Sequence, residues 1–570
     1  MTRRPIRALR AGAVALAVAV ALTACVSIPT RGPVAEGVAE VNEPAPVTLL
    51  GYSPGHDASP MEIVQGFLNA NAAGYSRETT ADVSTTFSVA REYLSGEVRS
   101  TWNPDEQVIV YPTASSPEIT LLTETQVQVK VGVAARIDAD GVYEESAPGS
   151  LQPLVFDLVK DSSDQWRISR LDNGVVLSEP NFELVFRQAA VYFLSADSTH
   201  LVPETRWFPV RNLATSVVRA LMDGPSPWLR DAVRTAVPDG VQLETGAVPV
   251  DADGTAEVSL SGAALGDVED RARMLAQLEA TLDIAQVNSV EVLAGGVPLA
   301  WEPARLARGS LPSDAALEGV QDDMLMTLGR GELSPVAGVG PLTGLDVTGA
   351  ARNEAGTVRV LLSGGDTLLR ASSSGGDEQL LAAEALTAPS ADRLGWVWTA
   401  AAGPDGPVIT AVRGGGARQV VRADWLAGRT VQEIRVARDG TRVAVLSTGA
   451  SGFGLDVTGV VRDQEGAPLQ LGEPIATGAT LTEASRVVWV DESTLGVLGK
   501  TAAATSTTVY LVPLAGQTRA LPALEGIVAL AGGKGERALY VTTADGELFV
   551  RSGPSWAYVS SGVRAPSFPG

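Results

Sequence analysis

The chain has 570 residues, 45% of them hydrophobic and 19% charged, which is the composition of a folded protein with room for several domains. Its formal net charge of −23 argues against nucleic-acid binding, because a phosphate-binding surface needs concentrated basic residues. A single cysteine excludes internal disulfides, and with only two histidines beside it a Cys/His zinc site is excluded as well.

Residues 1–24 have the pattern of a bacterial lipoprotein signal peptide. Four arginines precede an apolar run, residues 11–21, that is too short to span a bilayer as a helix. The sequence Leu22-Thr23-Ala24-Cys25 then matches a lipobox, in which the cysteine receives lipid and becomes the new N-terminus. We therefore expect Cys25 to carry an S-diacylglycerol group and an N-acyl chain such as palmitate, which anchors the protein to the extracytoplasmic face of the cell membrane. The alternative is an ordinary secretory signal peptide with a chance cysteine.

Residues 25–58 are predicted to form an extended tether, because they are rich in proline and glycine and have no sustained periodicity. The tether contains Gly51-Tyr52-Ser53-Pro54-Gly55, which fits the nucleophile-elbow pattern G-x-S-x-G. Pro54 has no N–H to offer to an oxyanion hole. We therefore do not expect Ser53 to be catalytic.

Residues 59–182 are predicted to form an N-terminal α+β domain. Ser59, followed by Pro60 and Glu62, is a helix start with a capping box. Apolar residues alternate over residues 127–133 and 154–158, and a further strand is expected at residues 166–171. A helix followed by antiparallel strands is typical of the α+β class.

Residues 185–303 are predicted to form a second α+β domain. It has a strand starting at residues 191–193, an amphipathic helix over 213–222 that stops at Gly224-Pro225, a helix through 274–282 and a strand over 290–293. Asp251-Ala252-Asp253-Gly254 resembles the start of a calcium loop, but Gly262 stands where such a loop needs its glutamate. We expect a hairpin turn there.

Residues 304–325 are predicted to be a linker, and residues 326–565 an all-β domain. Short strands recur throughout this last domain with turns between them, and Asp439-Gly440-Thr441 before a β-branched strand is a turn that recurs in β-propellers. At roughly 40–50 residues per blade the length allows about five or six blades. A pair of β-sandwiches is the alternative.

No set of residues with the spacing of an enzyme site stands out, so we expect no catalysis, no cofactor and no metal. His56 falls in the tether and His200 in a turn, away from any matched nucleophile and acid. Acidic pairs such as Asp322-Asp323, or Asp267 with Glu269 and Asp270, are more typical of a solvated surface in so acidic a chain.

Glycan binding remains an alternative role, because sugar sites use aromatic platforms beside carboxylates. Trp396 and Trp398 alternate with Val397 and so share one face of a predicted strand. An exposed groove at these tryptophans would favour a glycan-binding or glycan-hydrolysing envelope protein. Their burial between blades would count against it.

The order of these parts resembles a known family. Residues 213–227, Pro238-Asp239-Gly240, Asp253-Gly254 and Gly295-Gly296-Val297-Pro298 are similar to the GerMN domain. Together with the lipobox, residues 165–171 and the predicted propeller, they resemble the LpqB family of actinobacterial lipoproteins. The resemblance implies an accessory to the MtrA/MtrB two-component system that binds the extracellular domain of the sensor histidine kinase MtrB and tunes envelope homeostasis and cell division.

Overall fold

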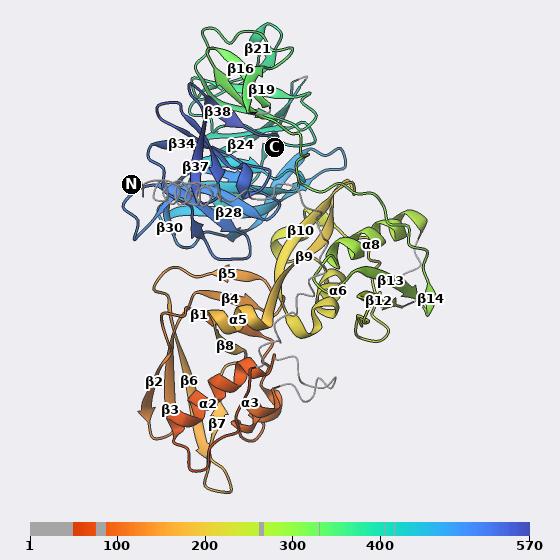
Figure 1. Ribbon diagram of the computed structural model, residues 1–570, viewed down its shortest axis with the longest axis vertical. Helices are drawn as coiled ribbons and strands as arrows, with labels where there is room; N and C mark the ends of the chain where they lie inside the picture. The colour runs from red at the N-terminus through yellow and green to blue at the C-terminus, as the bar shows by residue number, and fades with distance from the viewer. Residues whose placement is uncertain (1–48, 76–86, 262–266, 330, 405, 415) are drawn as a thin grey trace, which may run out of the picture. The chain divides into compact units, whose positions relative to one another are not determined.

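The computed structural model describes residues 49–75, 87–261, 267–329, 331–404, 406–414 and 416–570 (Figure 1). The predicted signal peptide, Cys25 and most of the predicted tether lie outside these residues. In the described part of the chain, every helix is too short or too polar to cross a bilayer. Two α+β domains are followed by an all-β domain, as the sequence predicts.

The first helix of the N-terminal domain, α2 (Pro60–Ala73), starts at the predicted capping box. Ser59 N donates to Glu62 Oε2 over 2.8 Å, and Glu62 N donates back to Ser59 Oγ over 3.4 Å. The apolar stripe of the helix, which includes Phe67, is buried in the core of the domain. The other helices here are α3 (Ser88–Glu92), α4 (Val98–Thr101) and α5 (Glu179–Val185).

Two four-stranded sheets complete this domain, in the orders β2-β3-β6-β7 and β5-β4-β1-β8. The strands are β1 (Gln107–Tyr111), β2 (Glu118–Thr123), β3 (Gln126–Gly132), β4 (Ala135–Asp138), β5 (Tyr143–Glu145), β6 (Leu151–Lys160), β7 (Trp166–Arg170) and β8 (Val175–Ser178). On β3 and β6 alternate residues, such as Val129 and Phe156, join α2 in the core. The opposite face of β6 leaves Leu151, Val155 and Val159 exposed.

The second domain is a layer of strands packed against two helices, α6 (Leu213–Asp223) and α8 (Val268–Thr281). One sheet has the order β10-β9-β11 and the other β12-β13-β14. The strands are β9 (Phe186–Ser195), β10 (Leu201–Pro209), β11 (Val233–Arg234), β12 (Thr255–Leu260), β13 (Ser289–Ala294) and β14 (Val297–Pro298), and α7 (Pro227–Arg230) is a short helix between β10 and β11 in sequence. Because α8 joins two parallel strands, β12 and β13, the unit is a β-α-β crossover.

The predicted calcium-like sequence of this domain is a tight turn before β12. Asp251 Oδ1 accepts the N–H groups of Asp253 and Thr255 over 2.9 and 2.8 Å. Gly254 has φ +81°, the left-handed conformation that such a turn requires. The carboxylate oxygen is therefore used by the backbone of the turn itself.

The all-β domain contains six four-stranded sheets among its described residues. Blade 1 consists of β15 (Leu317–Gln321), β16 (Met324–Gly329), β17 (Glu332–Pro335) and β38 (Arg564–Ser567). Blades 2 and 3 consist of β18 (Val347–Arg352), β19 (Arg359–Ser363), β20 (Thr367–Ser372), β21 (Gly375–Ala382), β22 (Ser390–Ala391), β23 (Val397–Ala402), β24 (Pro407–Arg413) and β25 (Ala417–Val421). Blades 4 to 6 consist of β26 (Thr430–Val436), β27 (Arg442–Gly449), β28 (Gly452–Arg462), β29 (Pro468–Ala476), β30 (Leu481–Trp489), β31 (Thr494–Thr501), β32 (Thr508–Pro513), β33 (Arg519–Ala520), β34 (Ile527–Ala531), β35 (Tyr540–Thr543), β36 (Leu548–Ser552) and β37 (Ser555–Ser560).

The sheets close into a propeller, which settles the choice against two sandwiches. One edge strand from each sheet contacts those of the neighbouring sheets in a ring, in the order β38, β18, β22, β26, β30, β34 and back to β38. The last strand, β38, pairs with β15 and so completes the first blade; in Figure 1 it lies, in blue, among green strands. Six blades agree with the range expected from length.

The propeller begins earlier in the sequence than expected. Strand β15 starts at Leu317, inside the stretch 304–325 that the sequence predicts to be a linker, and β38 extends past residue 565. The sequence does not predict this strand, because Glu318, a glutamate between apolar residues, suggests a solvated loop. In the structure Glu318 is buried and forms ion pairs with Arg352 and Arg359, each over 3.1 Å.

Candidate functional site

The residues that the sequence singled out as possible catalytic groups do not come together. Cys25 lies outside the described residues. His56 is exposed, and its Nδ1 lies 2.8 Å from Oδ2 of the neighbouring Asp57. Residues 51–55 are irregular chain ahead of α2, where a nucleophile elbow would need a strand followed directly by a helix.

The acidic pairs have local structural roles. Asp267 is the N-cap of α8, and its Oδ1 accepts the N–H groups of Glu269 and Asp270, each over 2.9 Å. Asp322 and Asp323 form the exposed turn between β15 and β16. Among residues the structure describes, no group of three His, Cys, Asp or Glu side chains is placed to hold a metal ion.

Trp396 and Trp398 do not form an exposed platform. Both are buried in the core of blades 3 and 4, with 6% and 0% of their surface exposed. The indole N–H of Trp398 donates to Asp392 Oδ2 over 3.1 Å. The glycan-binding alternative therefore loses the site that the sequence suggested for it, because alternation along a strand says which face two residues share but not whether that face is covered.

The centre of the propeller is filled by the protein itself. Residues 566–570 lie in the channel, where Arg438 donates to the carbonyls of Pro569 and Gly532 over 3.0 and 2.7 Å. Burial lowers the pKa of Arg438 to about 10, with Glu354, Asp491 and Asp439 opposing the shift. The cavity that these residues line measures about 50 Å³, which is too small for a ligand of ordinary size.

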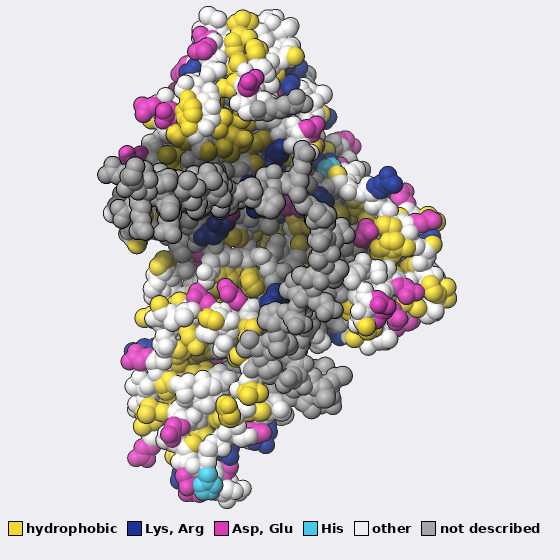
Figure 2. Space-filling model, in the orientation of Figure 1, with side chains coloured by type: hydrophobic (Ala, Val, Ile, Leu, Met, Phe, Trp, Pro, Cys, Tyr) yellow, Lys and Arg dark blue, Asp and Glu magenta, His cyan; other side chains and the backbone are white. Residues whose placement is uncertain are grey.

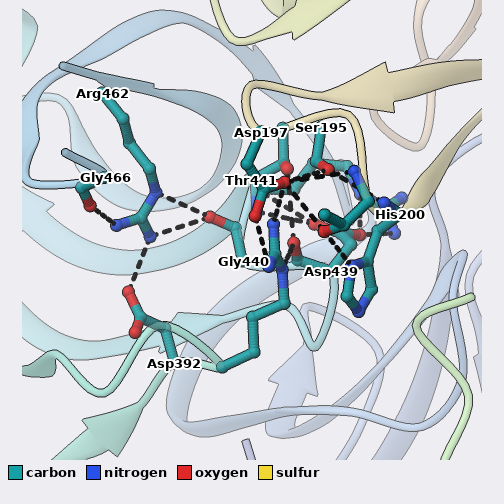
Figure 3. A network of polar contacts seen from close by, with 12 residues as sticks. Ser195, Asp197, His200, Asp392, Asp439, Gly440, Thr441, Arg462 and Gly466 are labelled. Carbon is teal, nitrogen blue, oxygen red and sulfur yellow. Dashed lines mark hydrogen bonds and ion pairs between the residues drawn. The ribbon is translucent and has the colours of Figure 1, made fainter. Parts of the chain in front are cut away.

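A polar network joins the β9–β10 turn of the second domain to blades 3 and 4 of the propeller (Figure 3). Arg393 donates to both carboxylate oxygens of Asp197 over 2.7 and 2.8 Å, and its Nε donates to the carbonyl of Asp439 over 2.7 Å. Ser195 and Thr199 donate to Asp197 over 2.6 and 3.0 Å. We call this set of contacts the polar joint.

The sequence cue Asp439-Gly440-Thr441 lies at the centre of the polar joint. The Asp439 carboxylate accepts the N–H groups of Thr441 and Arg442, and Arg442 completes a two-pronged ion pair with it over 2.6 and 2.9 Å. Both charged side chains are buried, with 0% and 1% exposed. Arg442 also donates to the carbonyl of Pro203 in β10 over 3.2 Å, so the propeller turn reaches into the second domain.

Two groups of the polar joint have shifted pKa values. Burial alone would raise the pKa of Asp197, but the hydrogen bonds from Arg393, Ser195 and Thr199 hold it well below its usual range. Burial, followed by the charge of Arg393, lowers the pKa of the half-buried His200. The joint is therefore built for an ionised Asp197 and a neutral His200.

The geometry of these residues is not that of a catalytic triad. His200 Nδ1 lies 2.9 Å from Thr199 Oγ1, whereas Ser195 Oγ donates directly to Asp197. A nucleophile activated by the imidazole, with the carboxylate on the other ring nitrogen, is absent from this described cluster. The polar joint holds two parts of the chain together.

An apolar contact reinforces the polar joint. Helix α7 packs against β28 and β29 of blade 4, and Trp228 and Leu229 share one buried cluster with Leu455. A Cβ added to Gly459 would lie 2.5 Å from the Cβ of Ala232, so the close approach requires glycine.

The sequence missed the pairs that make the polar joint, because Asp197 and Arg393 are separated by 196 positions and neither belongs to a motif. It also missed an open groove of about 940 Å³ on the second domain, lined by α8 and residues 301–308. Trp301 is the only signal that points to this groove, as a tryptophan outside the predicted strands and helices.

Three family models match the chain. Residues 53–183 match the N-terminal domain of lipoprotein LpqB, and residues 323–569 match the β-propeller domain of lipoprotein LpqB. Residues 190–300 match a domain described as sporulation and spore germination.

Relatives that are similar over most of this chain include proteins named lipoprotein LpqB in several bacteria. The protein of Bifidobacterium longum is 30% identical over 489 residues, which cover 81% of this chain and 80% of the relative. Those of Streptomyces coelicolor and Cutibacterium acnes are each 28% identical, over 100% and 99% of this chain and 98% and 99% of the relatives. The similarity thus extends over all three domains.

Proposed function

Since the chain belongs to the LpqB family of lipoproteins, we propose that it is a membrane-anchored, extracytoplasmic accessory protein that binds the extracellular domain of an MtrB-like sensor histidine kinase. In this proposal it modulates MtrA/MtrB two-component signalling in envelope homeostasis and cell division. It acts by docking, as neither an enzyme nor a cofactor-dependent protein.

The anchor in this proposal is the lipid on Cys25. Each buried CH₂ group contributes about 0.8 kcal/mol, and stable attachment needs more than one acyl chain. A diacylglyceryl group with an added N-acyl chain meets that requirement. The anchor keeps the folded domains close to the membrane in which the kinase lies.

One observation supports docking to a protein: the exposed apolar face of the sheet β2-β3-β6-β7. Leu151, Val155 and Val159 of β6 are 70%, 40% and 43% exposed. They stand four positions apart and so share one face of the sheet, turned away from α2. We call these three side chains the apolar face. In Figure 2, hydrophobic side chains are visible on the N-terminal domain among white and charged ones.

Apolar side chains gathered on one exposed sheet face are typical of a protein-interaction surface. Polar and charged residues stand among these side chains on the same face: Lys130 of β3 pairs with Pro153, and Arg167 of β7 pairs with Val159. A face that mixes exposed apolar and charged side chains fits a protein partner better than a lipid surface or a nucleic acid.

The test is a pull-down of the kinase extracellular domain by the full lipoprotein in detergent. Val155→Asp with Val159→Asp should abolish retention, because two carboxylates would be desolvated in the contact. Val420→Asp is the matched control, since Val420 is 52% exposed on β25 of the propeller. Failure of the wild-type protein to retain the kinase domain, with retention on peptidoglycan alone, would overturn the proposal.

A further inference from the structure

The groove on the second domain is a built feature, formed by α8 and by residues 301–308 that follow β14. Ala304 N donates to the carbonyl of Ala272 in α8 over 2.8 Å, and Leu201 N donates to the carbonyl of Ala307 over 2.8 Å. The segment is therefore tied to the domain on both sides of the groove. Ala276 and Ala280 of α8 line it, and their small side chains leave its floor open.

The groove carries an exposed indole. Trp301 stands in its wall with 38% of its surface exposed, whereas Trp228, Trp396 and Trp398 are buried. Covering a tryptophan is normally favourable, because its apolar area is large. An indole left open at the edge of a groove is thus available for a flat apolar surface of a ligand.

Polar groups without partners line the same groove as the indole. In the described part of the chain, the Glu279 carboxylate and the Arg305 guanidinium take part in no hydrogen bond or ion pair. Asp283 has only a long ion pair, 3.8 Å, with Arg308. The groove therefore offers both acceptors and donors, and its two acidic and two basic side chains balance in charge.

We propose that this groove binds a neutral oligosaccharide. The C–H face of a sugar ring matches the electron-rich face of an indole. Hydroxyl groups donate to Glu279 and accept from Arg305, which a purely apolar or a strongly charged ligand cannot do at once. The balanced charge disfavours polyanions and polycations alike, and the volume of about 940 Å³ has room for more than one ring.

This inference is independent of the kinase proposal, because the apolar face lies on a different domain. The saccharide could come from free oligosaccharide or from the glycan strands of the cell wall. Both present the same hydroxylated rings to the groove. The experiment therefore uses one soluble and one insoluble probe.

Calorimetry of the full lipoprotein in detergent with chitotetraose measures binding to the soluble probe, and co-sedimentation with purified sacculi measures binding to the wall. We expect saturable binding of chitotetraose. Trp301→Ala should abolish it, and Glu279→Gln should weaken it roughly tenfold or more, as for the loss of a hydrogen bond to a charged group. Retention on sacculi that chitotetraose displaces would identify the wall as the source; soluble binding without retention would identify free oligosaccharide.

Two matched variants separate binding from folding. Tyr558→Ala removes an aromatic residue that is 57% exposed on the propeller, and Glu257→Gln neutralises an exposed glutamate of β12. Both should bind as the wild type does. Absence of binding to chitotetraose and sacculi, or binding that survives Trp301→Ala, would overturn the inference, whatever the outcome of the kinase pull-down.

Discussion

Replacing Arg442 by alanine should destabilise the propeller severely. The side chain is 1% exposed and forms the two-pronged ion pair with Asp439, which is 0% exposed. Its guanidinium also lies 5.2 Å from the centre of the Trp489 ring. Arg442→Ala removes the positive charge and leaves the carboxylate of Asp439 buried without its cation.

The size of the effect follows from that unpaired charge. Breaking a buried ion pair on one side costs about 3–5 kcal/mol. For a domain of this size, roughly 2–4 °C of melting temperature corresponds to each kcal/mol, so the propeller should unfold about 6–20 °C lower. Asp439→Asn with Arg442→Met should recover part of the loss, because Asn keeps the oxygen that accepts the N–H groups of the turn while the charge is gone.

The melting temperatures can be measured by differential scanning calorimetry of the wild type, Arg442→Ala, the double variant and an exposed control. Arg486→Ala is the control, because Arg486 is exposed and donates only to the carbonyl of Ser485. Its free energy of unfolding should change by no more than about 0.5 kcal/mol, as is typical of surface substitutions, so its melting temperature should shift little. A loss in Arg442→Ala no larger than in Arg486→Ala would refute the view that the pair holds blade 4 together.

Three further changes test other parts of the chain. Cys25→Ala should abolish lipid labelling and leave the precursor unprocessed or released, as membrane fractionation would detect; normal retention would contradict the anchor. Lowering the pH should weaken the polar joint. Burial and the charge of Arg393 lower the pKa of His200 in the folded state. The stabilisation by neutral His200 is therefore complete above the unfolded-state pKa of about 6.5 and is lost as the pH falls toward the folded-state pKa. Unfolding measured from pH 8 to 5 should show a flatter profile for His200→Gln, and identical profiles would exclude this role. Gly459→Val should separate α7 from blade 4 at a cost of about 1–3 kcal/mol through overpacking, seen as faster proteolysis of the second domain; Gly329→Val, with open space around its Cβ, should be cleaved like wild type, and equal cleavage of both variants would count against the contact.

Local rules were sufficient for much of the fold. The helix at Ser59 and the turn at Gly254 were predicted because a cap and a left-handed glycine are decided by a few neighbouring residues. Repeated short strands likewise indicated the propeller. The strand β15, with which β38 pairs to close the ring, could not be predicted in this way. It contains Glu318, whose burial depends on ion pairs with arginines of the next blade.

The candidate functional surfaces could not be predicted from local sequence, because tertiary contacts decide them. Trp396 and Trp398 were correctly placed on a common face, but only packing between blades decided that this face is covered. Asp197 and Arg393 meet across two domains. Trp301 lines the groove together with residues of α8 such as Glu279, more than twenty positions earlier in the chain. No local spacing in the sequence links these residues.

The pairing of β38 with β15 limits the order in which the parts of the chain can fold. In the part of the chain that the structure describes, the N-terminal and second domains have no strand in common with the propeller, so each can gain its structure as soon as its own segment has been synthesised. Blade 1 must wait, because its innermost strand is synthesised about 240 residues after the strand that it pairs with. Until then the edge of β15 that pairs with β38 is open, and a chain that stops early would form an open ring prone to joining its neighbours.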